Sequence, residues 1–463
     1  MQSGTRGVVA PKNLRYDLWM QNITRPVIKI APPGPKAAAL IARDVAVASP
    51  SYIKEYPLVM ESGQGCFVTD VDGNTYLDFM AGIAVTSTGH AHPKVVKAVQ
   101  DSAAKFLHIC GTDFYYESMT TLLEKLSKAV PSMGPCKVFL SNSGTEAVEG
   151  AIKLARYHTK RQKIIAFNGA FHGRTLGAIT LNASKYTQKS NFGPLLPEVF
   201  HAPYSNPFHC PCGVSQAKAD TDCSCASYLE KEFFTRHFQP SEVAAIIVEP
   251  IQGEGGYIIP SKKFLKDLRA ICDKHGIVLI FDEIQSGMGR TGDLFAATTL
   301  GVTPDVVLSA KGIASGMPIG AIIAKTSVMT WGRGTHGSTY GGNPVCCAAA
   351  NATIEVLEEK LPHIRKVGQT FIAELKKMQT KHPVIADVRG IALMIGAEFI
   401  KKDGTPAADY VAALEQMAFR KGLLLLSCGK STIRFAPPLV ITEEEIKVGL
   451  EILDQCLTEL GTP

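Results

Sequence analysis

The sequence predicts an α/β fold built around a mostly parallel sheet. Short apolar runs recur between residues 137 and 324, and segments long enough for helices separate them. Strands that alternate with helices are typical of βαβ units, in which helices cover both faces of the sheet. Runs such as AAIIV (244–248) and IVLIF (277–281) contain no polar residue, as expected of strands buried on both faces.

The composition is that of an ordinary globular protein. The chain has 463 residues, of which 46% are hydrophobic and 19% charged, which suits two or three domains with a large core. A net charge of +6 is mild for this length, and no run of five Lys or Arg occurs, so neither nucleic acid nor a membrane surface is an expected partner. The apolar runs are far shorter than the ~20 residues that span a bilayer.

The N-terminus bears on the compartment. Residues 1–20 contain no apolar stretch of the kind found in secretion signals, which favours a cytoplasmic location. In that compartment we expect the twelve cysteines to be mostly reduced.

The predicted elements follow one another in three sections. Residues 68–79 are predicted to form a hairpin around Asp72-Gly73. The main strands follow at 137–142, 163–168, 244–250, 277–283, 305–310 and 319–324. After a helix that begins near residue 346, a smaller α/β unit is indicated by runs at 384–390, 392–400, 423–427 and 431–438. We divide the chain into an N-terminal segment (1–84) that packs with the small domain, a large domain (85–344) and a C-terminal small domain (345–463).

Polar residues at strand ends are the first candidates for a site, because ligands of parallel sheets bind beyond the carboxyl ends of the strands. SNSGTEAVEGAIKLAR (141–156) follows one strand and opens a helix, with Ser143 and Glu146 at capping-box spacing around Gly144. The free N–H groups of such a helix start bind anions such as phosphate. A capped helix that binds nothing fits the same pattern.

The turn NGAFHGRTLGA (168–178) follows the next strand. Phe171 offers an aromatic face for a flat ring, and Arg174 offers a bidentate partner for a carboxylate. A core phenylalanine beside a surface arginine fits the turn equally well.

FDEIQSGMGRTG (281–292) places Asp282 and Glu283 at a third strand end. Within it, GMGRTG (287–292) matches the dinucleotide pattern G-x-G-x-x-G. In the nucleotide fingerprint the glycine loop joins strand to helix directly, whereas here DEIQS intervenes. We therefore reject a dinucleotide site.

DVVLSAKGIASGMPIGA (305–321) places Lys311 at the end of an apolar strand and before a glycine-rich loop. A surface lysine is the ordinary interpretation, because an unpaired ammonium beside buried apolar residues is unfavourable. Together with Asp282, the helix start at Ser143 and the turn at Phe171, however, Lys311 fits pyridoxal 5′-phosphate. That cofactor needs a lysine for a Schiff base, an acid for its ring nitrogen and a phosphate cradle.

The order of these motifs resembles that of the class III (ω-type) aminotransferases. The resemblance covers about residues 50–460 and rests on SNSGTEAVEGAIKLAR, FHGRTLGA, VEPIQGEGGY, FDEIQSGMGRTG, SAKGIASGMPIGA and GSTYGGNP. AGIAVTSTGHAHPKVVKAVQ (81–100) looks most like 4-aminobutyrate aminotransferases. The resemblance implies the fold type I of pyridoxal-phosphate-dependent transferases. Its large domain has a mixed, mostly parallel seven-stranded sheet, and its small α/β domain is made from both chain ends.

The resemblance also implies roles for individual residues. Lys311 and Asp282 are the catalytic residues, the first as the cofactor-bearing lysine that transfers the proton and the second as the partner of the ring nitrogen. The cofactor-binding positions are Gly144, Thr145, Phe171, Asp282, Gln285, Lys311 and Thr339. Among these, Thr339 is expected to reach the site of the neighbouring subunit in a homodimer. The substrate-binding positions are Ile83, Arg174, Glu254 and Arg434.

Two of these implied roles concern carboxylates of the substrate. Arg174 is expected to hold the distal carboxylate. Glu254 is expected to pair with Arg434 while an ω-amine is bound and to release it to the α-carboxylate of glutamate.

The implied reaction is the transfer of an amino group from an ω-amino acid, 4-aminobutyrate being favoured, to 2-oxoglutarate, which gives an aldehyde and glutamate. An ornithine, acetylornithine or lysine aminotransferase stays open, as does a racemase or decarboxylase, because all of these share the cofactor motifs. An inactive binding protein is disfavoured, since Lys311 and Asp282 are both present. No metal is assigned to the site.

One segment departs from the family's pattern. FHCPCGVSQAKADTDCSCASY (208–228) contains Cys210, Cys212, Cys223 and Cys225, with His209 adjacent. Four cysteines so close together suit zinc or an iron–sulfur centre, but C-x-C is not the common C-x₂-C spacing. We favour a reduced or redox-labile surface loop and keep metal binding as the alternative.

Overall fold

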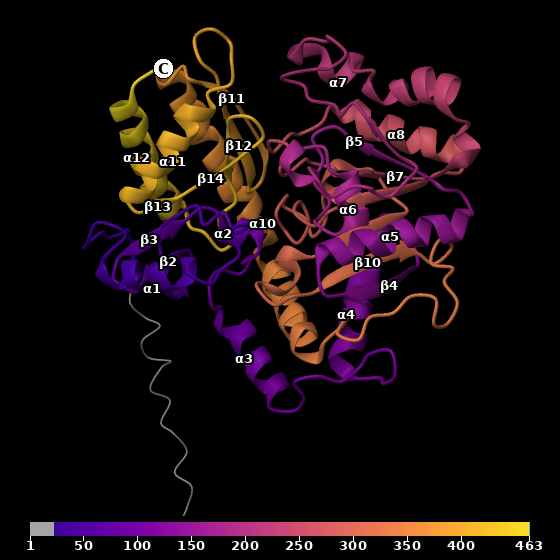
Figure 1. Cartoon of the computed structure of the whole chain (residues 1–463), viewed down its shortest axis with the longest axis horizontal. Helices are drawn as coiled ribbons and strands as arrows, with labels where there is room; N and C mark the ends of the chain where they lie inside the picture. The colour runs from indigo at the N-terminus through magenta and orange to yellow at the C-terminus, as the bar shows by residue number, and fades with distance from the viewer. Residues whose placement is uncertain (1–22, 463) are drawn as a thin grey trace, which may run out of the picture.

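The computed structural model describes residues 23–462. Figure 1 shows two parts side by side. The larger contains the middle of the chain, from magenta to orange, and the smaller combines the indigo N-terminal segment with the yellow C-terminal one. Residues 1–22, on which the expectation about a secretion signal rests, lie outside the described residues.

A seven-stranded sheet forms the centre of the larger part, with the order β4-β10-β9-β8-β7-β5-β6. Among these strands only β10 runs antiparallel to its neighbours, so the predicted mixed, mostly parallel sheet is confirmed. The strands are β4 (Cys136–Ser141), β5 (Lys163–Phe167), β6 (Val199–Ala202), β7 (Val243–Val248), β8 (Val278–Asp282), β9 (Val306–Ser309) and β10 (Gly320–Lys325).

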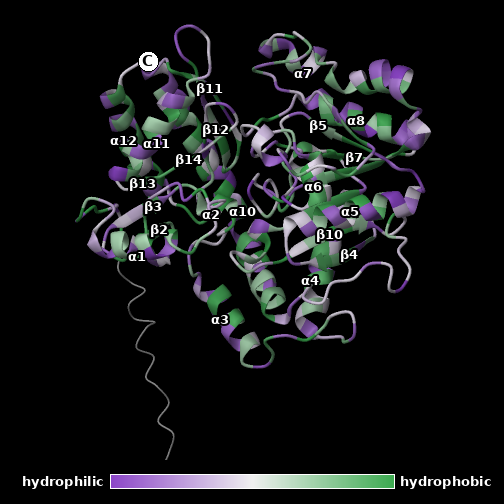
Figure 2. Cartoon of the chain, in the orientation of Figure 1, coloured by the Kyte–Doolittle hydropathy of each residue, from purple (hydrophilic) through white to green (hydrophobic). Residues whose placement is uncertain are grey.

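Successive residues of the central strands belong to two different cores. In β7, Ile247 packs with α5 (Gly144–Thr159) on one face, and Ile246 packs with α8 (Lys262–His275) on the other. Burial on both faces explains why these strands are continuous apolar runs. Figure 2 shows the central strands in green between helices that carry purple. The other helices of this part are α3 (Pro93–Ala103), α4 (Glu117–Lys128), α6 (Leu176–Leu181), α7 (Ala219–Asp222) and α9 (Ala296–Leu300).

Two four-stranded sheets form the smaller part. The first has the order β1-β2-β3-β13 and joins both chain ends, because β13 (Leu423–Leu424) runs parallel to β3 (Thr75–Asp78). The second has the order β11-β12-β15-β14. The remaining elements are α1 (Pro35–Val45), β1 (Met60–Gln64), β2 (Phe67–Asp70), α2 (Ala81–Ala84), β11 (Ile385–Ile391), β12 (Met394–Phe399), α11 (Ala408–Arg420), β14 (Leu426–Cys428), β15 (Thr432–Phe435) and α12 (Glu443–Leu460).

The hairpin predicted around Asp72-Gly73 is present between β2 and β3. Gly73 has a φ of +85°, which glycine adopts without strain. Asp70 Oδ1 accepts hydrogen bonds from the backbone N–H of Asp72 at 3.0 Å and of Asn74 at 2.8 Å, which fixes the turn.

The helix α10 (Pro344–Lys381) connects the two parts. It packs against α3 and α4 as well as against β11 and α12. The boundary that the sequence places between residues 344 and 345 falls at its first residue, and the division into domains stays a prediction. Between residues 23 and 462, no helix has both the length and the apolar character needed to cross a membrane.

Candidate active site

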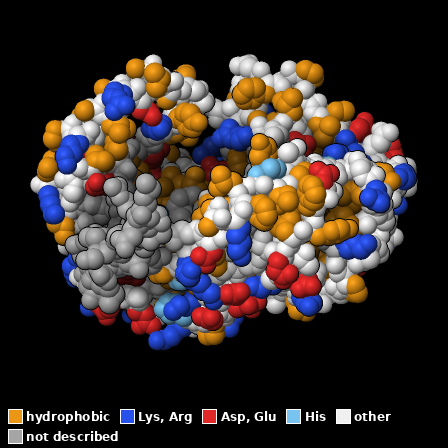
Figure 3. Space-filling view, turned by 90° about the horizontal axis from the view of Figure 1, so that it is seen from below, with side chains coloured by type: hydrophobic (Ala, Val, Ile, Leu, Met, Phe, Trp, Pro, Cys, Tyr) orange, Lys and Arg blue, Asp and Glu red, His pale blue; other side chains and the backbone are white. Residues whose placement is uncertain are grey.

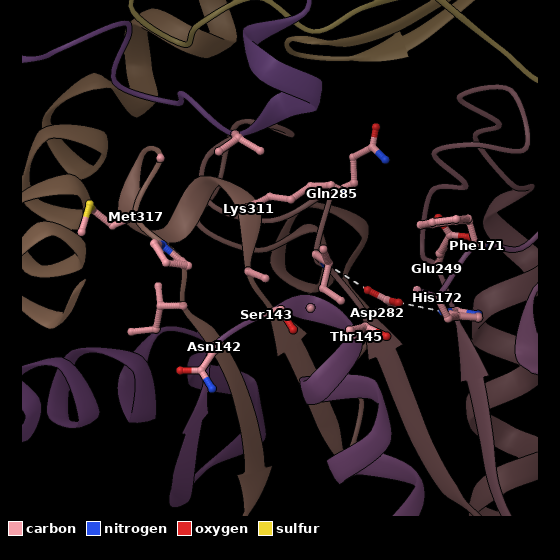
Figure 4. A pocket seen from close by; sticks show the side chains of 18 residues that line it. Asn142, Ser143, Thr145, Phe171, His172, Glu249, Asp282, Gln285, Lys311 and Met317 are labelled. Carbon is pink, nitrogen blue, oxygen red and sulfur yellow. Dashed lines mark hydrogen bonds and ion pairs between the residues drawn. The ribbon is translucent and has the colours of Figure 1, made fainter. Parts of the chain in front are cut away.

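Six of the residues predicted to bind a cofactor line one cavity of about 310 Å³ at the carboxyl ends of the central strands. They are Gly144, Thr145, Phe171, Asp282, Gln285 and Lys311. Figure 4 labels all of them except Gly144, together with His172 and Glu249, which line the same cavity. The sheet topology explains this convergence, because the loops after β4, β5, β7, β8 and β9 all meet at this edge.

Lys311 follows β9 and extends its side chain into the cavity (Figure 4). Its backbone has a φ of +43°, a left-handed conformation that is rare for residues with a side chain and that clusters at functional sites. Burial lowers the pKa of the Lys311 amine, and the charge of Arg434 acts in the same direction, whereas Asp282 opposes both. A lowered pKa increases the neutral fraction of the amine, which is the form that acts as nucleophile and base.

Asp282 ends β8 and is held by a buried histidine. His172 Nδ1 lies 2.7 Å from Asp282 Oδ2, and the other carboxylate oxygen accepts the backbone N–H of Ile284 at 3.1 Å. Both side chains are almost fully buried. Burial alone lowers the pKa of His172, but the hydrogen bond and charge of Asp282 outweigh it, so that the pKa of His172 is raised. Sequence analysis gave His172 no role, although it lies in the turn NGAFHGRTLGA next to Phe171.

The start of α5 lines the cavity with Ser143, Gly144 and Thr145. Ser143 is the N-cap and accepts the backbone N–H of Glu146 at 3.3 Å, as the capping-box spacing predicts. Gly144 brings the helix start close to the cavity wall, since a Cβ at this position would lie 2.8 Å from Ile284 Cδ1. The Thr145 hydroxyl accepts the backbone N–H of Arg174 at 3.3 Å, which ties the turn after β5 to this helix.

Glu249, which sequence analysis did not single out, joins two loops of the site. Its carboxylate accepts the backbone N–H of Phe171 at 3.0 Å and that of Gly253 at 3.0 Å. Burial raises the pKa of Glu249 to about 7; the charge of His172 lowers this pKa and that of Asp282 raises it further. The sequence feature that could have identified Glu249 is its position directly after an all-apolar strand.

Gln285 reaches the cavity from the loop after β8. Its side-chain oxygen accepts the Tyr257 hydroxyl at 2.8 Å, which leaves the amide N–H groups directed away from the tyrosine. Gly253 lies against the same amide, since a Cβ there would come 2.3 Å from Gln285 Nε2. The glycine therefore lets the loop after β7 approach the site.

Arg434 and Glu254 form the predicted ion pair. Arg434, on β15, is 5% exposed, and its Nη2 lies 3.2 Å from Glu254 Oε2. The Nε and Nη1 of Arg434 are buried and have no hydrogen-bond partner among the described residues. Sequence analysis did not anticipate that Lys185 Nζ lies 2.8 Å from the other oxygen of Glu254. One carboxylate thus holds two cations.

Five predicted site residues lie outside the set that lines the cavity: Glu254 and Arg434, which form the ion pair described above, and Ile83, Arg174 and Thr339. Ile83 is half exposed and has a φ of +68°, two positions before the cavity residue Val85. The guanidinium carbon of the exposed Arg174 lies 5.6 Å from the ring centre of Phe171. Thr339 is on the surface of the chain, so its predicted contribution to a neighbouring subunit's site stays a prediction.

The residues around the rejected dinucleotide pattern serve the fold. Glu283 points away from the cavity and accepts the backbone N–H of Ala297 at 2.8 Å in the first turn of α9. Arg290 is fully buried and donates to the carbonyl oxygens of Leu393 at 3.2 Å and Pro437 at 2.6 Å. The loop therefore fastens the larger part to the smaller.

Comparison with known proteins agrees with this geometry. The family model for class III aminotransferases matches residues 49–457. An alanine/serine racemase of Pyrococcus horikoshii is 39% identical over 94% of both chains. A 5-aminovalerate aminotransferase of Pseudomonas aeruginosa is 42% identical over 88% of this chain and 95% of the relative. A 4-aminobutyrate aminotransferase of Escherichia coli is 41% identical over 87% of this chain and 94% of the relative.

Solved structures show the same architecture. An amine transaminase from an uncultivated Pseudomonas species, crystallised with pyridoxal phosphate bound, superposes with a TM-score of 0.83. It is 28% identical, and the match covers 90% of this chain and 98% of the other.

Proposed function

The chain belongs to the class III aminotransferases and depends on pyridoxal phosphate, and from this premise we propose that it transfers an amino group from an ω-amino acid to 2-oxoglutarate. We favour 4-aminobutyrate as the donor, with an aldehyde and glutamate as products. The observation that carries the proposal is the buried Arg434, which Glu254 holds while two of its nitrogens have no hydrogen-bond partner among the described residues.

The residues of the cavity fit the cofactor. An amine at Lys311, a carboxylate at Asp282 and the free N–H groups at the start of α5 face one space, which are the three groups that pyridoxal phosphate requires. We infer that Lys311 holds the aldehyde carbon, Asp282 the ring nitrogen, and Gly144 and Thr145 the phosphate. When bound there, the cofactor withdraws electrons from the amine-bearing carbon of the substrate.

The chain's own residues then manage protons and orientation. Lys311 Nζ takes the proton from the amine-bearing carbon, a task that the lowered pKa of this amine favours. Asp282 would keep the ring nitrogen of the cofactor protonated, and the hydrogen bond from His172 Nδ1 holds the Asp282 carboxylate in place. Phe171 is positioned to stack on one face of a flat ring, and Glu249 fixes its backbone.

The Glu254–Arg434 pair suits an enzyme that alternates between two kinds of substrate. The amine-bearing carbon of an ω-amino acid carries no carboxylate, whereas that of glutamate does. A buried arginine without a partner would be unfavourable while the ω-amine is bound, and Glu254 supplies the partner. When glutamate arrives, its α-carboxylate replaces Glu254 at Arg434, and Lys185 keeps Glu254 paired.

Variants of this pair are expected to separate the two half-reactions. Arg434→Ala should slow the glutamate half-reaction about 10–100-fold, because it removes a charge-assisted hydrogen bond that contributes about 1.5–3 kcal/mol. The same variant should spare the 4-aminobutyrate half-reaction. Glu254→Ala should shift preference toward α-amino acids. Stopped-flow spectroscopy of the bound cofactor measures each half-reaction by itself. Equal losses in both half-reactions would contradict the role of the pair.

A homodimer is the assembly we propose. Four exposed apolar side chains lie on the segment between α3 and α4: Phe106, Leu107, Phe114 and Tyr115. Asn343 Nδ2 donates to the carbonyl oxygen of Leu107 at 2.8 Å, which brings the loop of Thr339 beside them. Figure 3, which views the end where α3 lies, shows hydrophobic side chains around a hollow between the two parts. Exposed apolar patches of this kind are typical of interfaces. Light scattering that gives the 49.7 kDa mass of one chain would contradict the dimer.

One assay tests the proposed function against its main competitor. The purified enzyme is supplied with 4-aminobutyrate, 5-aminovalerate or ornithine and 2-oxoglutarate, and glutamate is measured. The second candidate, favoured by the 39% identity to an alanine/serine racemase, is tested with L-alanine or L-serine in the absence of an oxo acid. Formation of the D-enantiomer with no glutamate from any ω-amine would overturn the proposal.

A further inference from the structure

The segment between β6 and the π-helix Leu229–His237 contains a cluster of three cysteines, with a fourth in contact with one of them. The sulfurs of Cys210, Cys223 and Cys225 all lie within 4.8 Å of one another. Cys212 Sγ lies 3.0 Å from Cys225 Sγ. Cys223 and Cys225 are 1% exposed, so the expectation of a surface loop is wrong for these two residues, which belong to the main core.

We propose that Cys210, Cys212, Cys223 and Cys225 bind one zinc ion. In a tetrahedral site with Zn–S bonds of about 2.3 Å, neighbouring sulfurs are about 3.8 Å apart. The separation of 3.0 Å for Cys212–Cys225 and the limit of 4.8 Å within the other three are compatible with that value. Cys212 lies outside the group of three whose sulfurs are all within 4.8 Å of one another, so this exposed residue must move toward Cys210 and Cys223 to complete four-fold coordination.

Neighbouring groups favour a single ion held by thiolates alone. His209 is adjacent in sequence, but neither of its ring nitrogens belongs to the group of ligand atoms within 4.8 Å of one another, and its Nε2 lies 2.6 Å from Glu398 Oε1. A two-iron cluster distributes its four cysteines over two metal atoms, whereas three of these sulfurs surround one point. Zinc is also redox-inert, which suits a closed structural site that takes no part in electron transfer.

The ion would stabilise the contact between the larger and the smaller part of the molecule. On the inner side, Ser205 Oγ lies 3.4 Å from Cys223 Sγ and 3.2 Å from Ser261 Oγ, the N-cap residue of α8. On the outer side, the loop reaches the small part through His209 and Glu398 on β12. Four thiolates around Zn²⁺ would therefore fix a segment that joins α8 to β12.

Metal analysis of the whole enzyme tests the proposal without any variant. The protein, purified without chelators and then desalted, should contain close to one zinc per chain and no stoichiometric iron or sulfide. Cys212→Ser changes an exposed ligand and should lower zinc retention at least about tenfold, by loss of one of four metal bonds. Cys136→Ser, at a partly buried cysteine on β4 outside the cluster, should retain the zinc.

Two further measurements identify the site itself. Replacement of zinc by Co²⁺ should give the intense d–d bands of a tetrahedral four-thiolate complex, at longer wavelengths than the cofactor absorbs. Chelation should raise hydrogen exchange across residues 205–228 and leave α5 protected. The proposal is overturned if the protein contains no zinc and takes none up when it is incubated with Zn²⁺. Iron with acid-labile sulfide, or disulfides between these cysteines, would overturn it equally.

Discussion

Lys311→Ala is expected to abolish turnover and to remove the visible absorption that pyridoxal phosphate shows when it is bound to a lysine. The loss of a general base alone costs about 10²–10⁴ in rate, which corresponds to about 3–5 kcal/mol. Here the covalent attachment disappears as well. Absorption spectra and steady-state assays with 4-aminobutyrate measure both effects.

Chemical rescue separates the two roles of Lys311. A small amine such as methylamine can enter the space that the truncated side chain leaves and take the proton in its place. Rescue should rise with pH, because only the neutral amine accepts a proton. Lys325→Ala is a control, since Lys325 is paired with Asp305 at 2.8 Å and lies outside the cavity. An unchanged visible spectrum in Lys311→Ala would overturn the assignment.

Asp282→Asn is expected to bind the cofactor and to lose most of its activity. A neutral amide cannot stabilise a protonated ring nitrogen, and removal of one electrostatic partner in a buried site costs about 10²–10³ in kcat. The variant should also lower the pKa of His172, because the hydrogen bond and charge that raise this pKa are removed while burial remains. Single-turnover kinetics and histidine NMR titration measure these two effects.

The adjacent residue provides a matched control for Asp282. Glu283 is equally buried, but it points away from the cavity and accepts backbone N–H groups at the start of α9. Burial raises the pKa of Glu283 to about 7, so Glu283→Gln removes a charge that is only partly present at neutral pH. This variant should keep the cofactor spectrum and most of the activity. A near-normal kcat in Asp282→Asn would contradict the electronic role of that carboxylate.

The sheet could be predicted because its strands are buried on both faces. In β7, β8 and β9 every residue is buried, and such runs are recognisable without any knowledge of the partners. The edge strand β6 was not predicted, because VFHA is short and three of its four residues are only partly buried. Parallel topology then fixes where strand ends meet, which is why Lys311 and Asp282 could be expected to share one edge.

Contacts made by side chains from distant loops could not be predicted in the same way. The bond between His172 and Asp282 joins residues 110 positions apart, and nothing in either turn specifies the other. Glu249 acquires its role only when the turns at Phe171 and Gly253 pack around it. The cysteine loop contains polar residues typical of a surface, yet its second C-x-C pair is covered by the helices that it contacts.

Because two cations share Glu254, we expect the proposed choice between substrates to depend on ionic strength. The Lys185 side chain is 48% exposed, whereas that of Arg434 is 7% exposed, so dissolved salt screens the first contact much more than the second. High salt should therefore weaken the ion pair between Lys185 and Glu254 and shift the Glu254 carboxylate toward Arg434, which is the arrangement proposed for ω-amines. At low salt the lysine competes better, and the population with Arg434 free for an α-carboxylate grows. The ratio of the two half-reaction rates, followed across a salt series, should change in this direction in the native enzyme and lose that dependence in Lys185→Ala.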